Sequence, residues 1–88
     1  MANKRKLEDN LNRAFDCNDI HVHEVRDIDN NKLTQLLITN SNFSLRMQFV
    51  KKGEDVLCPI MTFPKISMAD FEKAIKDVEK YFDEGVKQ

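Results

Sequence analysis

His21 and His23 are the residues of this 88-residue chain whose type and spacing come closest to a chemical site. Two histidines separated by one residue lie on the same face of a β-strand, where both imidazoles can approach one metal ion. Cys17, Asp19 or Glu24 would have to complete such a ligand set. The pair lacks the CxxC or HExxH spacing that makes a zinc site specific, so both histidines are weak candidates and we expect no metal and no other cofactor.

The other reactive residues form no catalytic pattern. Cys17 and Cys58 are far apart in the chain, and Cys58 lies in an apolar run, which raises the pKa of a thiol. The two glycines, Gly53 and Gly85, suit a turn and a helix end rather than a phosphate-binding loop. We therefore expect a protein that is not an enzyme.

The composition is typical of one small globular domain spanning residues 1–88. Apolar residues make up 41% and charged residues 33% of the chain, with two Gly and two Pro, which argues against disorder. No apolar run approaches the roughly 18 residues of a membrane span. The basic N-terminus is not followed by the apolar stretch of a secretory signal. We therefore expect a cytoplasmic protein with free thiols and no membrane association.

The elements that must position these residues follow the order α-β-β-β-β-α. A first helix is expected from Lys4 to Phe15 with Asn3 as its N-cap, and a last helix is expected to begin after Ser67. Apolar residues of the last helix recur at steps of three and four in one stripe: Met68, Phe71, Ile75, Val78 and Phe82. A lone helix gains little from such a stripe, so the preceding residues must supply a surface that buries it.

Four strands are expected to supply that surface. The first begins at Ile20 and has either a bulge or its end near Glu24, and the others span Leu33–Thr39, Phe43–Val50 and Val56–Phe63. Pro59 cannot donate to a ladder, which places the last strand at an edge. Short connections favour an antiparallel meander, and both helices are expected on one face of it. The predicted fold is thus a four-stranded α+β domain.

The uncovered face of this sheet is the candidate functional surface. In the third strand Phe43, Leu45, Met47 and Phe49 alternate with the polar set Ser44, Arg46 and Gln48. We assign the polar set to the uncovered face, flanked by Leu33 or Leu37 from the second strand and by Leu57, Met61 or Phe63 from the fourth, and we take Leu37 and Met61 as its candidates. The pattern of the fourth strand leaves open which of its sides is buried. Exposed apolar side chains around an arginine are typical of protein interfaces.

The sequence therefore predicts a small non-catalytic interaction domain of the adaptor, regulator or inhibitor type. It would bind a protein partner, or a second copy of itself, through the uncovered face or the edge strand. The simpler alternative is that strand twist and loops cover these apolar side chains and leave Arg46 solvated.

Nucleic-acid binding is the alternative function. Four basic residues support it: Lys32, Arg46, Lys51 and Lys52. They lie in a segment without acidic residues, residues 30–53, and an open sheet with basic side chains has the general layout of a single-strand binder. Such binders need exposed aromatic rings on the sheet, whereas Phe43 and Phe49 are expected in the core. Because the net charge is −1, nucleic acid is the less favoured partner.

Overall fold

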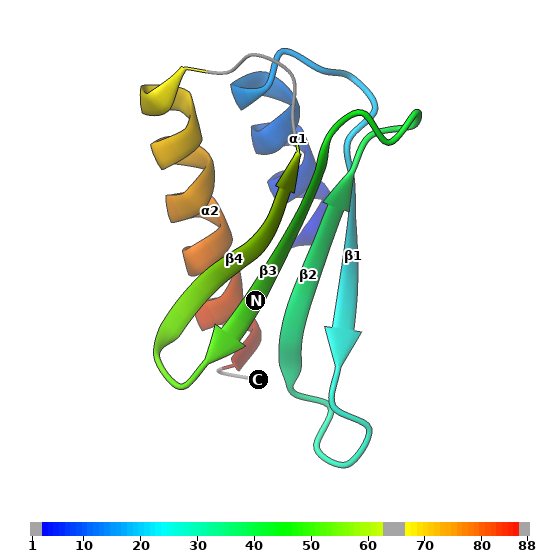
Figure 1. Cartoon of the computed structure of the whole chain (residues 1–88). Coiled ribbons are helices and arrows are strands. Elements are labelled where there is room, and N and C mark those ends of the chain that lie inside the picture. The colour runs from blue at the N-terminus through cyan, green and yellow to red at the C-terminus, as the bar shows by residue number, and fades with distance from the viewer. Residues whose placement is uncertain (1–2, 63–66, 87–88) are drawn as a thin grey trace.

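The computed structural model of the chain describes residues 3–62 and 67–86. Its elements, in chain order, are α1 (Lys4–Ala14), β1 (His21–Arg26), β2 (Leu33–Thr39), β3 (Arg46–Lys52), β4 (Asp55–Thr62) and α2 (Met68–Val86). The strands form an antiparallel sheet in the order β1-β2-β3-β4. Both helices lie on the same face of this sheet (Figure 1). The predicted α+β meander is therefore confirmed.

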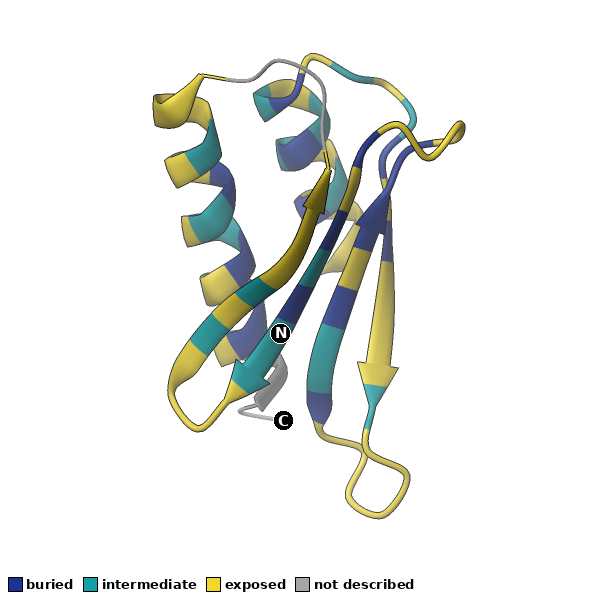
Figure 2. Cartoon of the chain, in the orientation of Figure 1, coloured by how far each residue is buried: buried dark blue, intermediate teal, exposed yellow. Residues whose placement is uncertain are grey.

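The core lies between the helices and the sheet, and the strands alternate between buried and exposed residues (Figure 2). The sheet contributes Val22, Leu33, Leu36, Ile38, Met47 and Phe49, and the helices contribute Leu7, Leu11, Ala74, Val78, Tyr81 and Phe82. No helix among the described residues is long and apolar enough to cross a membrane.

The first helix begins where the sequence predicted. The Asn3 side chain accepts a hydrogen bond of 3.1 Å from the backbone N–H of Lys6, which caps the helix. The helix ends at Ala14, and Phe15 follows as its C-cap with a buried side chain. Leu7 and Leu11 form the buried stripe, so the helix packs along one side as its periodicity requires.

The second helix also begins as predicted, but its buried side differs from the expected stripe. Asp70 N–H donates to Ser67 Oγ at 3.1 Å, and Ser67 donates in turn to the Asp70 carboxylate, as in a capping box. Met68 is 70% exposed rather than buried, whereas Ala74 and Tyr81 are buried without having been predicted. The helix packs against α1 as well as the sheet, which draws a second row of residues into the core.

The connection between β2 and β3 corrects the predicted start of the third strand. The Asn40 side chain accepts a 3.0 Å hydrogen bond from Leu45 N–H and donates at 2.9 Å to Ser44 Oγ. This side chain competes with the ladder, so residues 40–45 form a turn and pairing begins at Thr39 and Arg46. Phe43, expected in the core, has a φ of 59° and is 65% exposed.

Two irregularities set the faces of the strands. Val25 pairs with Gln35 and Arg26 with Leu33, so the extra residue lies in β2 and not in the first strand near Glu24 as predicted. In β4, Gln48 pairs with Ile60 and Val50 with Leu57, which leaves Phe49 opposite both Cys58 and Pro59. The bulge thus falls at Pro59, and β4 is an edge strand as predicted. Phe63, the predicted last residue of this strand, lies outside the described residues.

Candidate interaction face

Twelve side chains make up the face of the sheet that the helices leave uncovered, which we call the open face. Strand register arranges them in three rows across the sheet, because directly paired residues point to the same side. The rows are His21-Thr39-Arg46-Thr62, His23-Leu37-Gln48-Ile60 and Val25-Gln35-Val50-Leu57. The next pair along β3 and β4, Lys52 and Asp55, continues this side of the sheet, so the end of the open face also carries one lysine and one aspartate.

Apolar side chains are exposed across the open face. Val25, Leu37, Leu57 and Ile60 each have more than a third of their surface accessible, and Leu57 reaches 48%. Most other large apolar side chains in the described part of the chain are buried on the opposite side of the sheet. Val25 and Leu37 lie on the adjacent strands β1 and β2, Leu57 and Ile60 lie on β4, and the partly buried Val50 of β3 lies between the two groups on the same face.

Arg46 stands in the first row of the open face without a partner in the described residues. Its guanidinium makes no hydrogen bond or ion pair to residues 3–62 or 67–86 and is exposed. Gln48 of the second row donates to Gln35 of the third row at 2.7 Å, so these two amides satisfy each other. Among its apolar side chains the open face therefore presents one unpaired guanidinium in the first row and one closed polar pair.

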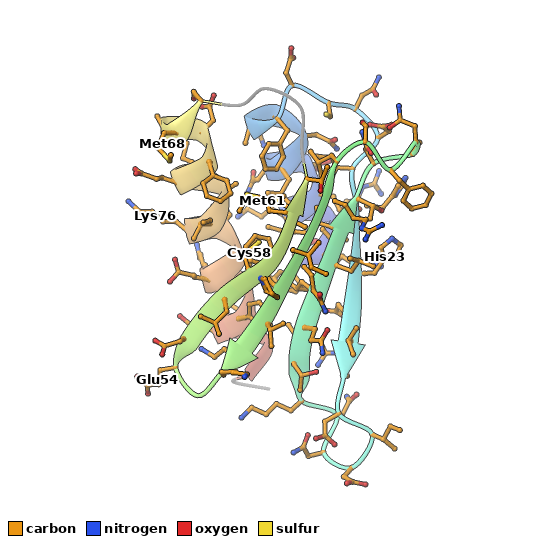
Figure 3. All side chains as sticks on the ribbon, in the orientation of Figure 1. His23, Glu54, Cys58, Met61, Met68 and Lys76 are labelled. Atoms are coloured by element: carbon orange, nitrogen blue, oxygen red, sulfur yellow. The ribbon has the colours of Figure 1, made fainter. Side chains whose placement is uncertain are left out.

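The structure brings three of the five predicted interface residues together. Leu37, Arg46 and Gln48 lie on the open face as expected. Ser44 lies outside the strand, in the turn that Asn40 organises, where its hydroxyl accepts the Asn40 amide. Met61 pairs with Met47, whose side chain is buried toward the helices, so Met61 lies on the helix side of β4 at the margin of the core (Figure 3). Assigning Met61 to the uncovered face was wrong, because the bulge at Pro59 reverses the alternation along β4.

The two histidines lie on the open face, one row apart on β1. Within residues 3–62 and 67–86, no group of three or more His, Cys, Asp and Glu side chains is arranged to hold a metal ion. Glu24, named above as a third ligand, points to the helix side, because it pairs with buried Leu36. The two imidazoles are therefore exposed polar groups of the open face.

The four basic residues proposed for nucleic-acid binding do not form one surface. Lys51 points to the helix side, where its side chain is only 14% exposed and its Nζ lies 4.0 Å from the Asp83 carboxylate. Lys32 lies in the β1–β2 loop and Lys52 at the far end of β3, away from Arg46 in the first row. These four side chains therefore do not form a continuous basic surface along the sheet.

One lateral edge of the sheet is closed by α1. The Glu8 carboxylate accepts a 2.8 Å hydrogen bond from the N–H of Val22, and the Asn12 side chain accepts one of 3.0 Å from Ile20 N–H. These acceptors occupy donors with which another strand would pair. The donors of Ile20 and Val22 are therefore not free to pair with an added strand at the start of β1, and β4 is the other edge of the sheet.

A polar cluster that the sequence did not predict joins β1 to the end of α2. The Tyr81 hydroxyl donates to Glu24, which also pairs with Arg26 at 3.2 Å. Partial burial acts to raise the pKa of Glu24, but the hydrogen bonds from Tyr81 and Arg26 outweigh it and lower that pKa below its usual value. Burial, and then the Glu24 carboxylate, raise the pKa of Tyr81, so its hydroxyl stays protonated.

The two cysteines are free and unreactive in character. Burial, followed by the charges of Asp19 and Asp16, raises the pKa of the Cys17 thiol, and burial raises that of Cys58. A thiol with a raised pKa is a poor nucleophile at neutral pH.

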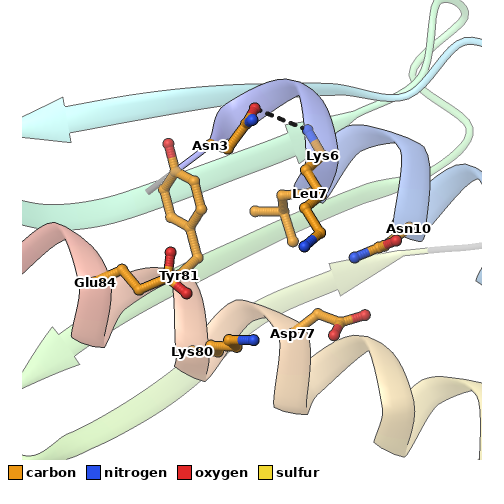
Figure 4. A pocket seen from close by; sticks show the side chains of 8 residues that line it. All are labelled: Asn3, Lys6, Leu7, Asn10, Asp77, Lys80, Tyr81 and Glu84. Carbon is orange, nitrogen blue, oxygen red and sulfur yellow. Dashed lines mark hydrogen bonds between the residues drawn. The ribbon is translucent and has the colours of Figure 1, made fainter. Parts of the chain in front are cut away.

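A groove of about 380 Å³ runs between α1 and α2 on the side away from the sheet (Figure 4). It is lined by Asn3, Lys6, Leu7, Asn10, Asp77, Lys80, Tyr81 and Glu84. Its cationic and anionic side chains are interspersed and open to water, so they concentrate no charge of one sign. The open face remains the better candidate for a functional surface.

Comparison with known proteins adds no assignment. No protein-family profile matches the chain, and no curated protein or solved structure matches it significantly.

Sequence reasoning missed part of the open face. Val25 was not predicted on the open face because it lies opposite the bulge in β2, and Ile60 was not because it follows the bulge in β4. A bulge shifts the alternation of side chains between the two faces of a strand. Their β-branched type was the available signal, since such residues favour strands, but the register decides which side they face.

Proposed function

We propose that this chain is a small, non-catalytic protein-interaction domain that binds a protein through its open face. The observation that carries the proposal is the combination of four exposed apolar side chains with an unpartnered arginine on one sheet surface. Apolar area gives the favourable free energy of association, and arginine is enriched at the centres of protein interfaces.

The arrangement supports binding better than catalysis. The three full rows of the open face carry two imidazoles, two hydroxyls, two amides and one guanidinium as their polar side chains. The described ionisable groups with shifted pKa values, Cys17, Glu24, Cys58 and Tyr81, all lie off this face. The sequence and the fold thus support a docking surface.

Affinity capture from the source cells with wild-type and Arg46→Glu proteins tests the proposal. Arg46 is exposed and unpartnered, so the variant should keep the wild-type thermal midpoint yet lose the captured protein. Lys76→Glu makes the same charge change on the exposed side of α2 and serves as the matched control (Figure 3). Capture that survives in Arg46→Glu, or unfolding of that variant, would show that the face is structural.

A further inference from the structure

The β1–β2 loop, residues 27–32, presents the most exposed large apolar side chain in the described part of the chain. Ile28 is 99% exposed, and Asp27 and Asp29 flank it. The loop extends past the ends of β3 and β4, away from the core (Figure 1). A fully exposed isoleucine gains no free energy of burial from folding, so this side chain is available for contact with another molecule.

This loop is held in one conformation by its own hydrogen bonds. Asp27 N–H donates to the carbonyl of Lys32 at 2.8 Å, and Asn31 N–H donates to the carbonyl of Asp27 at 2.8 Å. The Asp27 carboxylate accepts Asp29 N–H at 2.8 Å, and the Arg26 guanidinium donates to the carbonyl of Asn31 at 3.0 Å. A loop that is ordered before binding loses little conformational entropy when it docks, so more of the contact free energy appears as affinity.

The loop adjoins the open face at its most apolar row. Val25, which is 44% exposed, precedes the loop by two residues and belongs to the third row of that face. The polar member of this row, Gln35, bonds to Gln48, so the row offers a partner mainly apolar side chains. A protein that covers the third row therefore comes within reach of the loop.

The charges at this end of the sheet define the chemistry of a matching surface. The two aspartates are next to Ile28, whereas Lys32, the only cation of the loop, is four residues away from it. The Asp29 carboxylate makes no hydrogen bond or ion pair within the described part of the chain. Lys52 and Asp55, the charged pair at the same end of β3 and β4, add no net charge. An apolar side chain beside an unpaired carboxylate is complemented by an apolar pocket with a cation at its rim.

We propose that the protein bound at the open face also holds the β1–β2 loop, with Ile28 inserted into an apolar pocket of that partner and a lysine or arginine of the partner beside Asp29. This inference rests on the proposed function and states the chemistry of the same partner. At the other end of the sheet the partner places a carboxylate beside Arg46. Opposite charges at the two ends fix the direction in which the partner lies along the strands.

The two contacts fit within one interface of ordinary size. They are separated by the length of β1, which has six residues and therefore spans about 20 Å. A standard interface covers roughly 800 Å² on each partner, which corresponds to a patch about 30 Å across. One partner can therefore reach the first row of the open face and the loop together.

Binding measurements with loop variants test the proposal. Affinity capture with the wild-type protein supplies the partner, and isothermal titration calorimetry then measures its dissociation constant. Ile28→Ser should weaken binding about tenfold to a hundredfold, as expected when an isoleucine is no longer buried by the partner. Asp29→Lys should weaken binding at least about tenfold, and Asp29→Asn should have a smaller effect. Asp27 is left intact because its carboxylate holds the loop.

The variants should not affect the fold. Ile28 is almost fully exposed and the Asp29 carboxylate is unpaired within the described residues, so both substitutions should leave urea unfolding unchanged. Lys76→Glu changes a charge on the exposed side of α2, outside both contacts, and should leave the affinity unchanged as the matched control (Figure 3).

A photo-crosslinker identifies the surface that the loop contacts. Ile28→p-benzoylphenylalanine should cross-link to a peptide of the partner that lines an apolar pocket with a lysine or arginine at its rim. Changing that cation of the partner to glutamate should restore the affinity that Asp29→Lys loses, because the two charges are exchanged.

Loop variants that bind the partner with wild-type affinity would overturn the inference. So would a cross-link to a site without a neighbouring cation, a cross-link to a second copy of this chain, or a charge exchange that restores nothing.

The proposed function is judged separately, by Arg46→Glu. If this variant loses the partner while the loop variants keep it, the open face is the docking surface and the loop contact is wrong. If only the loop variants lose the partner, the loop contact stands and the open face is not the docking surface. If the wild-type protein captures no protein, both proposals are wrong.

Discussion

Tyr81→Phe tests whether the hydrogen bond between α2 and β1 stabilises the fold. The substitution removes only the hydroxyl that donates to Glu24 and keeps the ring, which is buried among core residues. A hydrogen bond to a charged group contributes about 1.5–3 kcal/mol net. The Glu24 side chain remains 26% exposed and keeps its pairing with Arg26, so water and Arg26 replace part of the lost bond. We therefore expect a loss of about 1–2 kcal/mol in the free energy of unfolding at pH 7.

The loss should depend on pH with a defined sign. The pKa of Glu24 is lowered in the folded state, so its contribution to stability is present above its usual value near 4.5. That contribution is lost as the pH falls through the folded-state pKa. The stability difference between wild-type and Tyr81→Phe should accordingly narrow at pH 3, and Glu24→Gln should remove this pH dependence.

Urea unfolding of the wild-type protein, both single variants and the double variant measures the coupling directly. The m-value should stay constant, because the surface exposed on unfolding hardly changes. For a domain of this size a loss of 1 kcal/mol lowers the thermal midpoint by about 4–8 °C. Tyr81→Phe within about 0.3 kcal/mol of wild type at pH 7, or an equal deficit at pH 3, would refute the reasoning.

Three further outcomes follow from the packing and the surface. Phe82→Ala empties a fully buried position and should cost about 3–5 kcal/mol by urea unfolding; a cost below about 1 kcal/mol would contradict its burial. Glu8→Ala should accelerate hydrogen exchange at the Val22 amide, and unchanged exchange would show that α1 does not close the β1 edge. Phe43→Asn, measured where the protein is monomeric, should raise stability by up to about 1 kcal/mol, because asparagine tolerates the positive φ; a decrease would mean that the ring packs on the chain.

The nature of the candidate site was predictable only in part. Residue alternation in β3 places Arg46 and Gln48 opposite Met47 and Phe49, and the structure agrees. The prediction failed for Ser44, which Asn40 draws into the turn before β3, and for Met61 of β4, which the bulge at Pro59 moves to the helix side. Side-chain hydrogen bonds to the backbone and single-residue insertions compete with the ladder, and a periodic pattern does not report that competition.

The conformation of the β1–β2 loop was likewise predictable from the sequence only in part. The residue types of Asp29-Asn30-Asn31 are typical of a turn, and Asn31 has the positive φ that such residues accept. The exposure of Ile28 in this loop was not predictable from the sequence, because an apolar residue that follows a strand is equally compatible with a continuation of that strand.

The sequence by itself determined the order of helices and strands, the N-terminal caps of both helices and the antiparallel meander, because capping, turn chemistry and periodicity are local properties of the chain. The end of α2 was not determined in this way, because the helix continues through Gly85, which the sequence suggested as its end, to Val86. The tertiary structure decided which side of each strand is left uncovered, that Tyr81 reaches Glu24, and that the acidic loop and Arg46 lie at opposite ends of one sheet. These features depend on register and on contacts between residues distant in sequence. A one-residue shift in register reverses a strand's faces while leaving its local pattern unchanged.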